Sequence, residues 1–481
     1  MQMSPMTQQL LIPPLASHGG ITVLSSARRP GPSSQQVGWR SSRRWLLASG
    51  GALAGAALAA CAGGSPSPAP AAKPVAIDYW HIFGGTDTPT MDHMVAAFQA
   101  SHPTITVNTT QIGFNDFTDK ITVAFASGTP PNVFMNGPAP HASAYGILRQ
   151  VKSVDTFAKR DKITPDLWLP ALQPTFVNAG KMYGLRFNTD VRVLYYNAEA
   201  FAEAGLDPNK PPVSWDDLID YAHKLTKKSG DSLVRAGWWP GTGQVRFEWL
   251  HWSNGGTLTD PSGSKVLFND QIGVGTLDFV AKVADAVAPA AQYAEFAKGF
   301  GSNENDPFIT GKLAMVADGS WLKATYDKYG GNLKYKAALL PYAKKQTSIS
   351  GGFTMMIPAS NPAEKDEASW ELLKFLCTDR EQQLFMSKTG QLSALVALQN
   401  DPFFAADPIM SVIARQMKAT GLFVWQPPAS KLGSALIDAK NGAINKKASS
   451  KELLETAAQI TQTAMDDYNR QHPEWLQNFG K

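Results

Sequence analysis

Tryptophan side chains crowd one short stretch of this sequence, together with charged and amide groups. Four tryptophans fall within 15 residues: Trp238, Trp239, Trp249 and Trp252, with Arg246, Glu248 and Asn254 among them or beside them. An indole ring offers a flat apolar face on which the C–H face of a sugar ring can stack. Carboxylates, amides and guanidinium groups bind the surrounding hydroxyls. These residue types in one stretch therefore favour a site for a polyhydroxylated ring.

A core position is the alternative interpretation for each tryptophan, because large aromatic side chains also dominate ordinary cores. Trp238 and Trp239 directly precede the loop residues 240–243, Pro-Gly-Thr-Gly. Two adjacent indoles at the entrance to a loop are not expected to share one buried position, so this pair is predicted to face a ligand. Trp321 and Trp425 are two further candidate aromatic surfaces.

Residues 1–60 have the three-part form of an export signal. Arg43 and Arg44 precede a 16-residue apolar segment, 45–60, which ends in small residues before Cys61. A bilayer span needs about 20 apolar residues, so a membrane helix followed by a fortuitous cysteine is the weaker alternative. The run 58–61, Leu-Ala-Ala-Cys, resembles a bacterial lipoprotein signal, and residues 42–47 resemble a twin-arginine motif. The resemblance implies cleavage before Cys61 and lipid attachment to its sulfur.

Removing this signal changes the charge balance of the chain. Residues 1–60 hold five arginines and no Lys, Asp or Glu, so the 44 basic residues fall to 39 against 40 acidic ones. The formal net charge moves from +4 to −1. The shortened chain therefore gives no argument for binding nucleic acid or anionic lipid. Residues 61–74, rich in proline, alanine and serine, are predicted to be a flexible tether.

The folded part begins with alternating strands and helices. Apolar periodicity predicts strands near 75–79, 105–107 and 132–135, separated by helices near 91–98 and 117–125. The crossover rule makes such a sheet parallel, and ligands bind outside the carboxyl ends of its strands. The expected binding loops are 80–86, 113–116 and 136–141. The 421 residues that follow the signal are enough for two domains.

Two runs carry the most specific pattern in the chain. Residues 194–208 read Leu-Tyr-Tyr-Asn-Ala-Glu-Ala-Phe-Ala-Glu-Ala-Gly-Leu-Asp-Pro, and residues 211–218 read Pro-Pro-Val-Ser-Trp-Asp-Asp-Leu. They closely resemble the signature of family 1 extracellular solute-binding proteins of ABC importers. Other runs that look like this family are Tyr79–His81, Phe125–Val133, Gly311–Met315 with Gly319 and Trp321, and Gly351–Gly352. The family's usual Pro-Asp-Val reads Pro-Asn-Val here, at 131–133.

The resemblance implies an α/β protein with the type II periplasmic-binding-protein fold. Its two discontinuous lobes, with parallel-rich sheets, are expected to close about a hinge over a ligand in the cleft between them. The expected division is 75–188 plus about 315–360 for lobe I, and 189–314 plus 361–481 for lobe II. The resemblance also implies a carbohydrate ligand, an ABC permease as partner and a lipid-anchored monomer on the outer face of the cell membrane. No enzymatic activity, cofactor or metal is expected.

Position in the family pattern also implies which residues line the cleft. The candidate hydroxyl acceptors are Asn115, Asp116, Asn136, Asp190 and Asp318, and the candidate donors are Arg192 and the N–H groups of Gly351 and Gly352. The candidate aromatic surfaces are Trp80, Trp238, Trp239, Trp252, Trp321 and Trp425. For Asp116 and Asp190 the alternative is helix capping or a surface turn.

Two alternatives to a sugar binder stay open. Residues 194–225 are especially similar to a family branch that takes glycerol-phosphate compounds, and phosphate recognition favours Arg. Where that branch supplies an Arg, residues 423–428 read Phe-Val-Trp-Gln-Pro-Pro, which favours a mono- or oligosaccharide over a glycerophosphodiester. An exported carbohydrate hydrolase would use paired carboxylates. The chain carries no HExxH, GxSxG, CxxC, GxGxxG or P-loop motif, and the apolar pattern around Cys377 predicts a buried, inert thiol.

Overall fold

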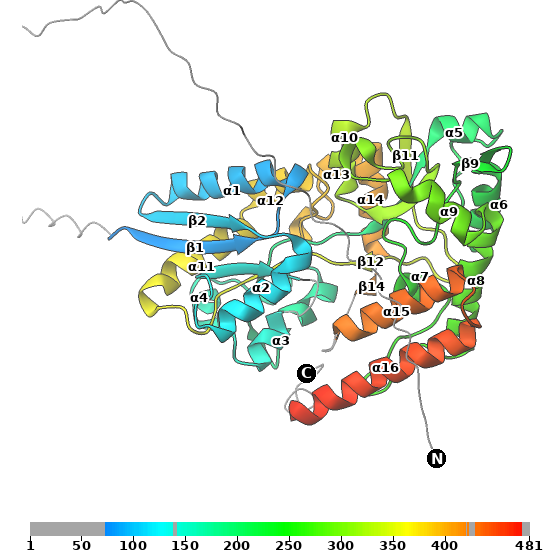
Figure 1. Cartoon of the computed structure of the whole chain (residues 1–481). Coiled ribbons are helices and arrows are strands. Elements are labelled where there is room, and N and C mark those ends of the chain that lie inside the picture. The colour runs from blue at the N-terminus through cyan, green and yellow to red at the C-terminus, as the bar shows by residue number, and fades with distance from the viewer. Residues whose placement is uncertain (1–72, 138–141, 420, 423–428, 474–481) are drawn as a thin grey trace, which may run out of the picture. The chain divides into compact units, whose positions relative to one another are not determined.

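The computed structural model describes residues 73–137, 142–419, 421–422 and 429–473 (Figure 1). Two sheets, each with its own helices and hydrophobic core, hold most of the regular structure of these residues. The predicted signal, Cys61 and nearly all of the predicted tether lie outside the described residues, as does Trp425.

The first sheet has the strand order β2-β1-β3-β13-β6. Its strands are β1 (Val75–His81), β2 (Ile105–Gln111), β3 (Val133–Asn136), β6 (Leu185–Arg186) and β13 (Thr354–Met356). β1 pairs in parallel with β2 and β3, which confirms the arrangement predicted from the alternating strands and helices. β13 pairs antiparallel with β3 and β6, so a much later segment of the chain completes this sheet.

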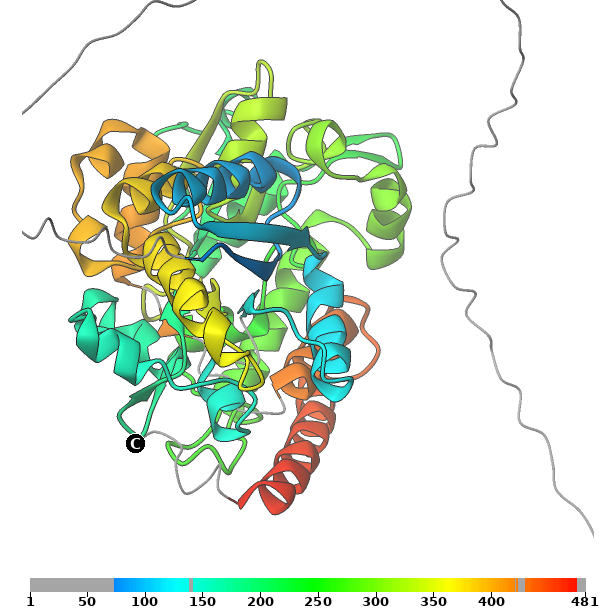
Figure 2. The ribbon, with the colours of Figure 1, turned by 90° about the vertical axis from the view of Figure 1, so that its left-hand side faces the viewer.

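Helices from two separate parts of the chain pack against the first sheet. They are α1 (Thr88–Ser101), α2 (Phe114–Ala126), α3 (Ala142–Ile147), α4 (Asp155–Arg160), α11 (Ala363–Thr378) and α12 (Arg380–Ser387). Although far apart in sequence, α1 and α11 contact each other (blue and yellow in Figure 2). Their apolar side chains and those of the strands form one core, and we call this sheet with its helices lobe I.

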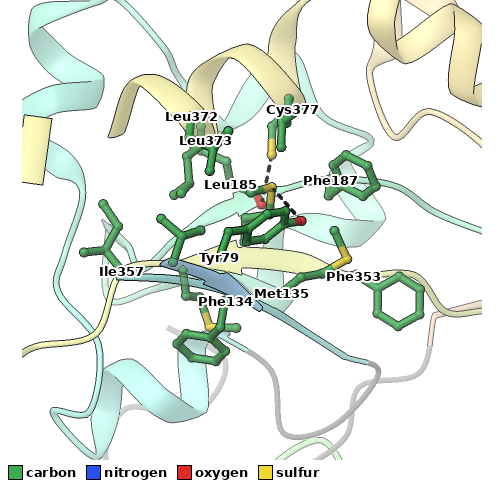
Figure 3. Packing of buried hydrophobic residues seen from close by; sticks show 14 of the residues in the cluster. Tyr79, Phe134, Met135, Leu185, Phe187, Phe353, Ile357, Leu372, Leu373 and Cys377 are labelled. Atoms are coloured by element: carbon green, nitrogen blue, oxygen red, sulfur yellow. Dashed lines mark hydrogen bonds between the residues drawn. The ribbon is translucent and has the colours of Figure 1, made fainter. Parts of the chain in front are cut away.

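Tyr79 lies at the centre of the core of lobe I, between the sheet and α11 (Figure 3). Its hydroxyl group donates to the sulfur of Met355, with an O–S distance of 3.9 Å. Cys377 of α11 is fully buried, and its thiol points to the carbonyl oxygen of Leu185 at 3.6 Å. Burial raises the pKa of this thiol well above its ordinary value, which confirms the prediction of a buried, unreactive cysteine.

The second sheet has the order β10-β7-β11, and both pairings are antiparallel. Its strands are β7 (Arg192–Asn197), β10 (Met315–Gly319) and β11 (Tyr335–Ala338). The helices around it are α5 (Ala198–Glu203), α6 (Trp215–Leu225), α7 (Phe247–Ser253), α8 (Gln271–Val287), α9 (Ala290–Phe296), α10 (Leu322–Tyr329), α13 (Pro402–Ala406) and α14 (Pro408–Lys418). We call this second sheet, its helices and its core lobe II.

A smaller core extends lobe II at the C-terminal end of the chain. It joins α8 to α15 (Ala429–Ile444) and α16 (Ser450–Gln471), which pack along each other (orange and red in Figure 1). The remaining strands form short pairs: β4 (Val177–Asn178) with β5 (Lys181–Met182), β8 (Lys227–Ser229) with β9 (Ser232–Arg235), and β12 (Ile349–Ser350) with β14 (Gly421–Leu422).

The family-like segment contains a helix-capping motif. The Ser214 hydroxyl accepts from the N–H of Asp217 at 3.0 Å, and the Asp217 carboxylate accepts from the N–H of Ser214 at 2.9 Å. This capping box begins α6. Trp215 stacks on Phe279 of α8 with ring centres 3.9 Å apart, so its indole packs between two helices.

Three segments cross between the lobes: residues 187–191, 349–353 and 398–404. The predicted lobe boundary is wrong in two places. Residues 315–350 belong to lobe II, because β10 and β11 pair with β7. Residues 361–398, apart from Leu392, belong to lobe I, because α11 buries Trp370 and its apolar neighbours in that core.

Candidate ligand-binding site

Arg186 is a fully buried arginine that ties two crossing segments together. Its Nε donates to the carbonyl oxygen of Asn188 at 2.9 Å, and its Nη2 donates to the carbonyl oxygen of Gly351. Burial lowers the pKa of Arg186 to about 10, while the charge of Asp190 raises it. The guanidinium therefore keeps its charge at neutral pH and uses it to hold backbone carbonyls.

Asn188 links its own crossing segment to the segment that contains Phe353 and to the segment that contains Gln391. Its Oδ1 accepts from the N–H of Phe353, and its Nδ2 donates to Oε1 of Gln391, each at 2.8 Å. Gln391 then donates to Asp87 Oδ2 at 2.8 Å, at the loop after β1. Burial raises the pKa of Asp87 to about 6, against the lowering effect of the bond from Gln391.

Asp190 is a buried carboxylate that forms an ion pair with Arg192. Its Oδ1 also accepts from the N–H of Gly351 at 2.7 Å. A Cβ atom at Gly351 would lie 2.8 Å from Asp190 Oδ2, so only glycine allows this approach. The N–H of Gly351, predicted to donate to a ligand, is instead engaged by Asp190. Asp190 itself is a buried cross-link between crossing segments and neither a helix cap nor a surface turn.

Arg192 and Trp321 form a stacked pair in lobe II. The guanidinium carbon of Arg192 lies 5.0 Å from the centre of the Trp321 ring, within the range of a cation–π interaction. Gly319 faces Arg192 across the β7–β10 pair. A Cβ atom at Gly319 would lie 2.2 Å from the indole, so the ring rests directly on this glycine. The half-buried indole thus lies beside a guanidinium.

Asp318 adds a titratable carboxyl group next to this pair. Burial raises the pKa of Asp318 to about 7, although the N–H of Gly319, at 2.6 Å, and the charge of Arg192 both lower it. Near neutral pH this carboxyl group can therefore either donate to a hydroxyl or accept from one.

A pocket beside Asp190 has walls from both lobes. Leu169 and Leu172 come from lobe I, and Met417 comes from the end of α14 in lobe II. Thr189 and Ser350 supply hydroxyl groups 2.7 Å apart, one from each of two crossing segments. The pocket therefore combines a carboxylate and hydroxyls with apolar walls at the junction of the lobes.

The loops after β1, β2 and β3 converge on the crossing segment 349–353, as the parallel sheet predicts. Phe114, at the start of α2, is 54% exposed, and its ring centre lies 6.3 Å from that of Phe353. The ring centre of Phe83 lies 6.2 Å from the ring centre of Phe353. After β3, a Cβ atom at Gly137 would lie 2.5 Å from the carbonyl oxygen of Gly352.

The predicted polar residues of lobe I are placed in different ways. Asn136 is buried, and its amide nitrogen donates to the hydroxyl of Tyr145 at 2.7 Å, which is a packing contact. Asn115 and Asp116 are exposed in the first turn of α2, where neither caps the helix. Trp80 is half-buried against the core of lobe I. In the described part of the chain the side chains of Asn115 and Asp116 thus do not cap α2, whereas the amide of Asn136 is engaged by Tyr145.

Trp238 and Trp239 are core residues, so the prediction that they face a loop entrance is wrong. They are 1% and 5% exposed. The Trp239 ring is stacked on Tyr293 of α9, with ring centres 3.9 Å apart. This partner lies more than 50 residues away in sequence and provides the second indole with a buried surface of its own. Trp252 is half-buried against the same core, and Trp249 is 1% exposed.

Sequence reasoning missed several residues that the structure brings to the site. They are Arg186, Asn188 and Gln391 in or beside the crossing segments, and Lys440 in lobe II. Only Lys440 had a detectable local signal, because it interrupts the apolar face of a helix that also carries Leu436, Ala439 and Ala443.

Within the described ranges, no group of three or more His, Cys, Asp or Glu side chains is placed to hold a metal ion. The same part of the chain contains no helix long and apolar enough to cross a membrane.

This α/β fold of two lobes is shared with solved structures of sugar-binding proteins. Residues 93–412 match the family of bacterial extracellular solute-binding proteins, and the chain belongs to that family.

Known relatives and solved structures agree with this assignment. The sn-glycerol-3-phosphate-binding periplasmic protein UgpB of Escherichia coli strain K12 is 26% identical over 365 residues, which cover 71% of this chain and 80% of UgpB. A structure of CpMnBP1 with mannotriose bound has a TM-score of 0.72 at 22% identity, covering 80% of this chain and 99% of that one. The substrate-binding protein Lmo0181 of Listeria monocytogenes, in complex with cycloalternan, has a TM-score of 0.71 at 19% identity, covering 81% and 99%.

Proposed function

We propose that this protein is the extracytoplasmic substrate-binding component of an ABC importer and that it captures a mono- or oligosaccharide between its lobes. The arrangement of Asp190, Arg192 and Trp321 carries the proposal. It gathers a carboxylate, a guanidinium and an indole at the junction of the lobes, and these groups suit the hydroxyls and the C–H face of a sugar ring. The oligosaccharides in the structures of CpMnBP1 and Lmo0181 support the same ligand class.

Binding is coupled to closure of the two lobes in this proposal. The ligand would contact lobe I through the loops after its parallel strands and lobe II through Trp321. A ligand shifts the balance between open and closed forms only by its different affinity for them. The closed form would then dock on the membrane subunits of the importer and deliver the sugar. Small-angle scattering that showed no compaction with a tightly bound saccharide would contradict this step.

A glycerophosphodiester or glycerol phosphate is the second candidate ligand. UgpB, which is similar over most of its length, is named for binding sn-glycerol 3-phosphate. Arg192 offers a guanidinium of the kind that binds phosphate, although Asp190 already pairs with it.

A thermal-shift screen distinguishes these ligands. It would cover mono-, di- and oligosaccharides, glycerophosphodiesters and glycerol 3-phosphate, with titration calorimetry on each hit. A stabilising saccharide recovered intact supports the proposal, and a stabilising phosphodiester alone supports the second candidate. Release of reducing ends would instead identify a hydrolase. If none of these compounds bound, the proposed ligand class would be wrong.

Lipid attachment at Cys61 would keep this binder beside its permease. A diacylglyceryl group supplies two chains, and stable anchoring needs at least two such signals. Metabolic labelling with a radioactive fatty acid in a bacterial host tests this part. We expect label in the wild type and in the control Cys377→Ala, and none in Cys61→Ala. Equal labelling of Cys61→Ala would exclude this anchor.

A further inference from the structure

Lys440 is a buried lysine in α15, only 7% exposed. Its Nζ donates to the carbonyl oxygen of Val245 at 2.5 Å. Across the residues that the structure describes, Lys440 forms no ion pair with a carboxylate. A fully buried lysine is normally paired, because removing an ammonium group from water is costly.

Glu248 is an equally buried carboxylate in the first turn of α7, 2% exposed. Its Oε1 has no hydrogen-bond partner among the described residues. The preceding residue, Phe247, packs in the same small core as Ala439 and Ala443, so α7 and α15 are in contact (Figure 1). Glu248 and Lys440 therefore belong to one buried junction between these helices.

Arg246 brings a second cation to this junction. It is half-buried between Val245 and Phe247, and in the described part of the chain its side chain makes neither a hydrogen bond nor an ion pair. The charges of Arg246, Lys440 and Arg192 all act on Glu248. Because Arg192 is already paired with Asp190, the charges of two other cations act on this one carboxylate.

This charged cluster adjoins the ligand site described above. The N–H of Gln244 donates to the carbonyl oxygen of Ala317 in β10 at 2.8 Å. A Cβ atom at Gly243 would lie 3.1 Å from Asp318 Oδ2. The loop that carries Arg246 therefore runs along the end of β10, next to Asp318 and the Arg192–Trp321 pair.

The protonation of the cluster fits an excess of positive charge near neutral pH. Burial lowers the pKa of Lys440 to about 8, with Glu248 raising it and Arg246 lowering it. Burial raises the pKa of Glu248, and the charges of Arg246, Lys440 and Arg192 lower it. At pH 7 Lys440 is therefore mainly protonated.

We propose that Arg246, Lys440 and Glu248 form a subsite for an oxyanion, a phosphate or a carboxylate, on a hydroxylated ligand. The inference rests on the proposed function, because it concerns one end of the same ligand. Arg246 and Lys440 supply charged N–H donors for the anionic oxygens. Glu248 Oε1 accepts a hydrogen bond from a neighbouring hydroxyl, which satisfies its buried oxygen.

Calorimetric titration of the full-length protein with matched compounds tests this subsite. The pairs are sn-glycerol 3-phosphate with glycerol, glucose 6-phosphate with glucose, and glucuronate with glucose. We expect at least one anionic compound to bind about tenfold or more tightly than its neutral counterpart at pH 7. The glucose 6-phosphate and glucuronate arms distinguish a phosphate from a carboxylate.

Substitutions then assign this preference to the cluster. Arg246→Gln and Lys440→Met are expected to reduce the preference for the anion to near unity. Lys282→Gln, at an exposed lysine of α8, is the matched control and should keep the preference. If Lys440→Met fails to fold, Arg246→Gln at its half-buried position tests by itself whether the preference for the anion depends on this cluster.

Two further outcomes separate this inference from the proposed function. Wild-type protein that binds neutral saccharides with no preference for any anionic compound overturns the subsite and leaves the sugar binder intact. Binding of no saccharide or polyol at all overturns the proposed function and the subsite together. A preference for anions that survives both substitutions also overturns the subsite.

Discussion

Arg186 donates a hydrogen bond to the carbonyl oxygen of Gly351, which lies 165 residues later in the chain. The bond connects the start of crossing segment 187–191 to crossing segment 349–353. Arg186 forms no ion pair with a described carboxylate, and its donors go to the carbonyls of Asn188 and Gly351 and to the Thr354 hydroxyl, the last at 3.4 Å. Two crossing segments are thus held together through their backbones.

Arg186→Met is expected to lower the free energy of unfolding by about 3 kcal/mol. Two buried carbonyl oxygens lose their donors, and each such loss costs about 1–3 kcal/mol. Methionine retains much of the side-chain volume, so the change in the free energy of unfolding comes mainly from the lost hydrogen bonds. Urea denaturation measures the change. Arg415→Met, at an exposed arginine of α14, is the control and should change stability by less than about 0.5 kcal/mol. Equal effects of the two substitutions would contradict this role of Arg186.

Gly352→Ala is expected to destabilise the protein by at least about 2 kcal/mol. Gly352 has φ +96°, and its Cβ would lie 2.5 Å from the carbonyl oxygen of Asn188 and 2.8 Å from Nη2 of Arg186. Gly275→Ala, within α8, is the control, and it is expected to stabilise the protein. Its Cβ meets only a side-chain nitrogen at 3.9 Å, and alanine favours a helix by about 1 kcal/mol over glycine. A neutral Gly352→Ala in thermal unfolding would show that the crossing segment tolerates another backbone conformation.

The elements that sequence reasoning predicted correctly depend on neighbours within a few residues. The first three strands, α1 and α2 follow from apolar periodicity. The edge at which the loops of lobe I meet follows from the parallel order of these strands.

The features that sequence reasoning missed depend on contacts between distant residues. β10 and β11 are short apolar strands, and nothing local shows that they pair with β7 instead of the first sheet. Trp239 is buried because Tyr293 lies against it. Glu248 and Lys440 meet only when α7 and α15 pack, 192 residues apart in sequence. Such partners are chosen by tertiary packing, which a single sequence does not display.

Asp318→Asn is expected to stabilise the protein above pH 7 and to have little effect near pH 4. Burial raises the pKa of Asp318 to about 7 in the folded protein, above its ordinary value of about 3.9. A carboxyl group with a raised pKa loses its stabilising contribution as the pH rises between these two values. The stability difference between variant and wild type should therefore grow to as much as about 4 kcal/mol at pH 8. Urea denaturation at pH 4, 6 and 8 measures it. Asp231→Asn, at an exposed aspartate, should show no such trend, and a flat Asp318→Asn difference would exclude a raised pKa.

Trp321→Ala is expected to weaken binding of the tightest saccharide about tenfold, because the ligand loses its stacking surface and Arg192 loses the ring that orients it. Trp321→Phe keeps a smaller ring over Gly319 and should recover part of the affinity. Trp215→Ala removes an indole of equal size that stacks on Phe279, so it should lower the melting temperature and leave the dissociation constant unchanged. Titration calorimetry with the same saccharide compares the three variants. Wild-type affinity in Trp321→Ala would place the sugar elsewhere at the lobe junction, whereas equal losses in Trp321→Ala and Trp215→Ala would trace the effect to general destabilisation.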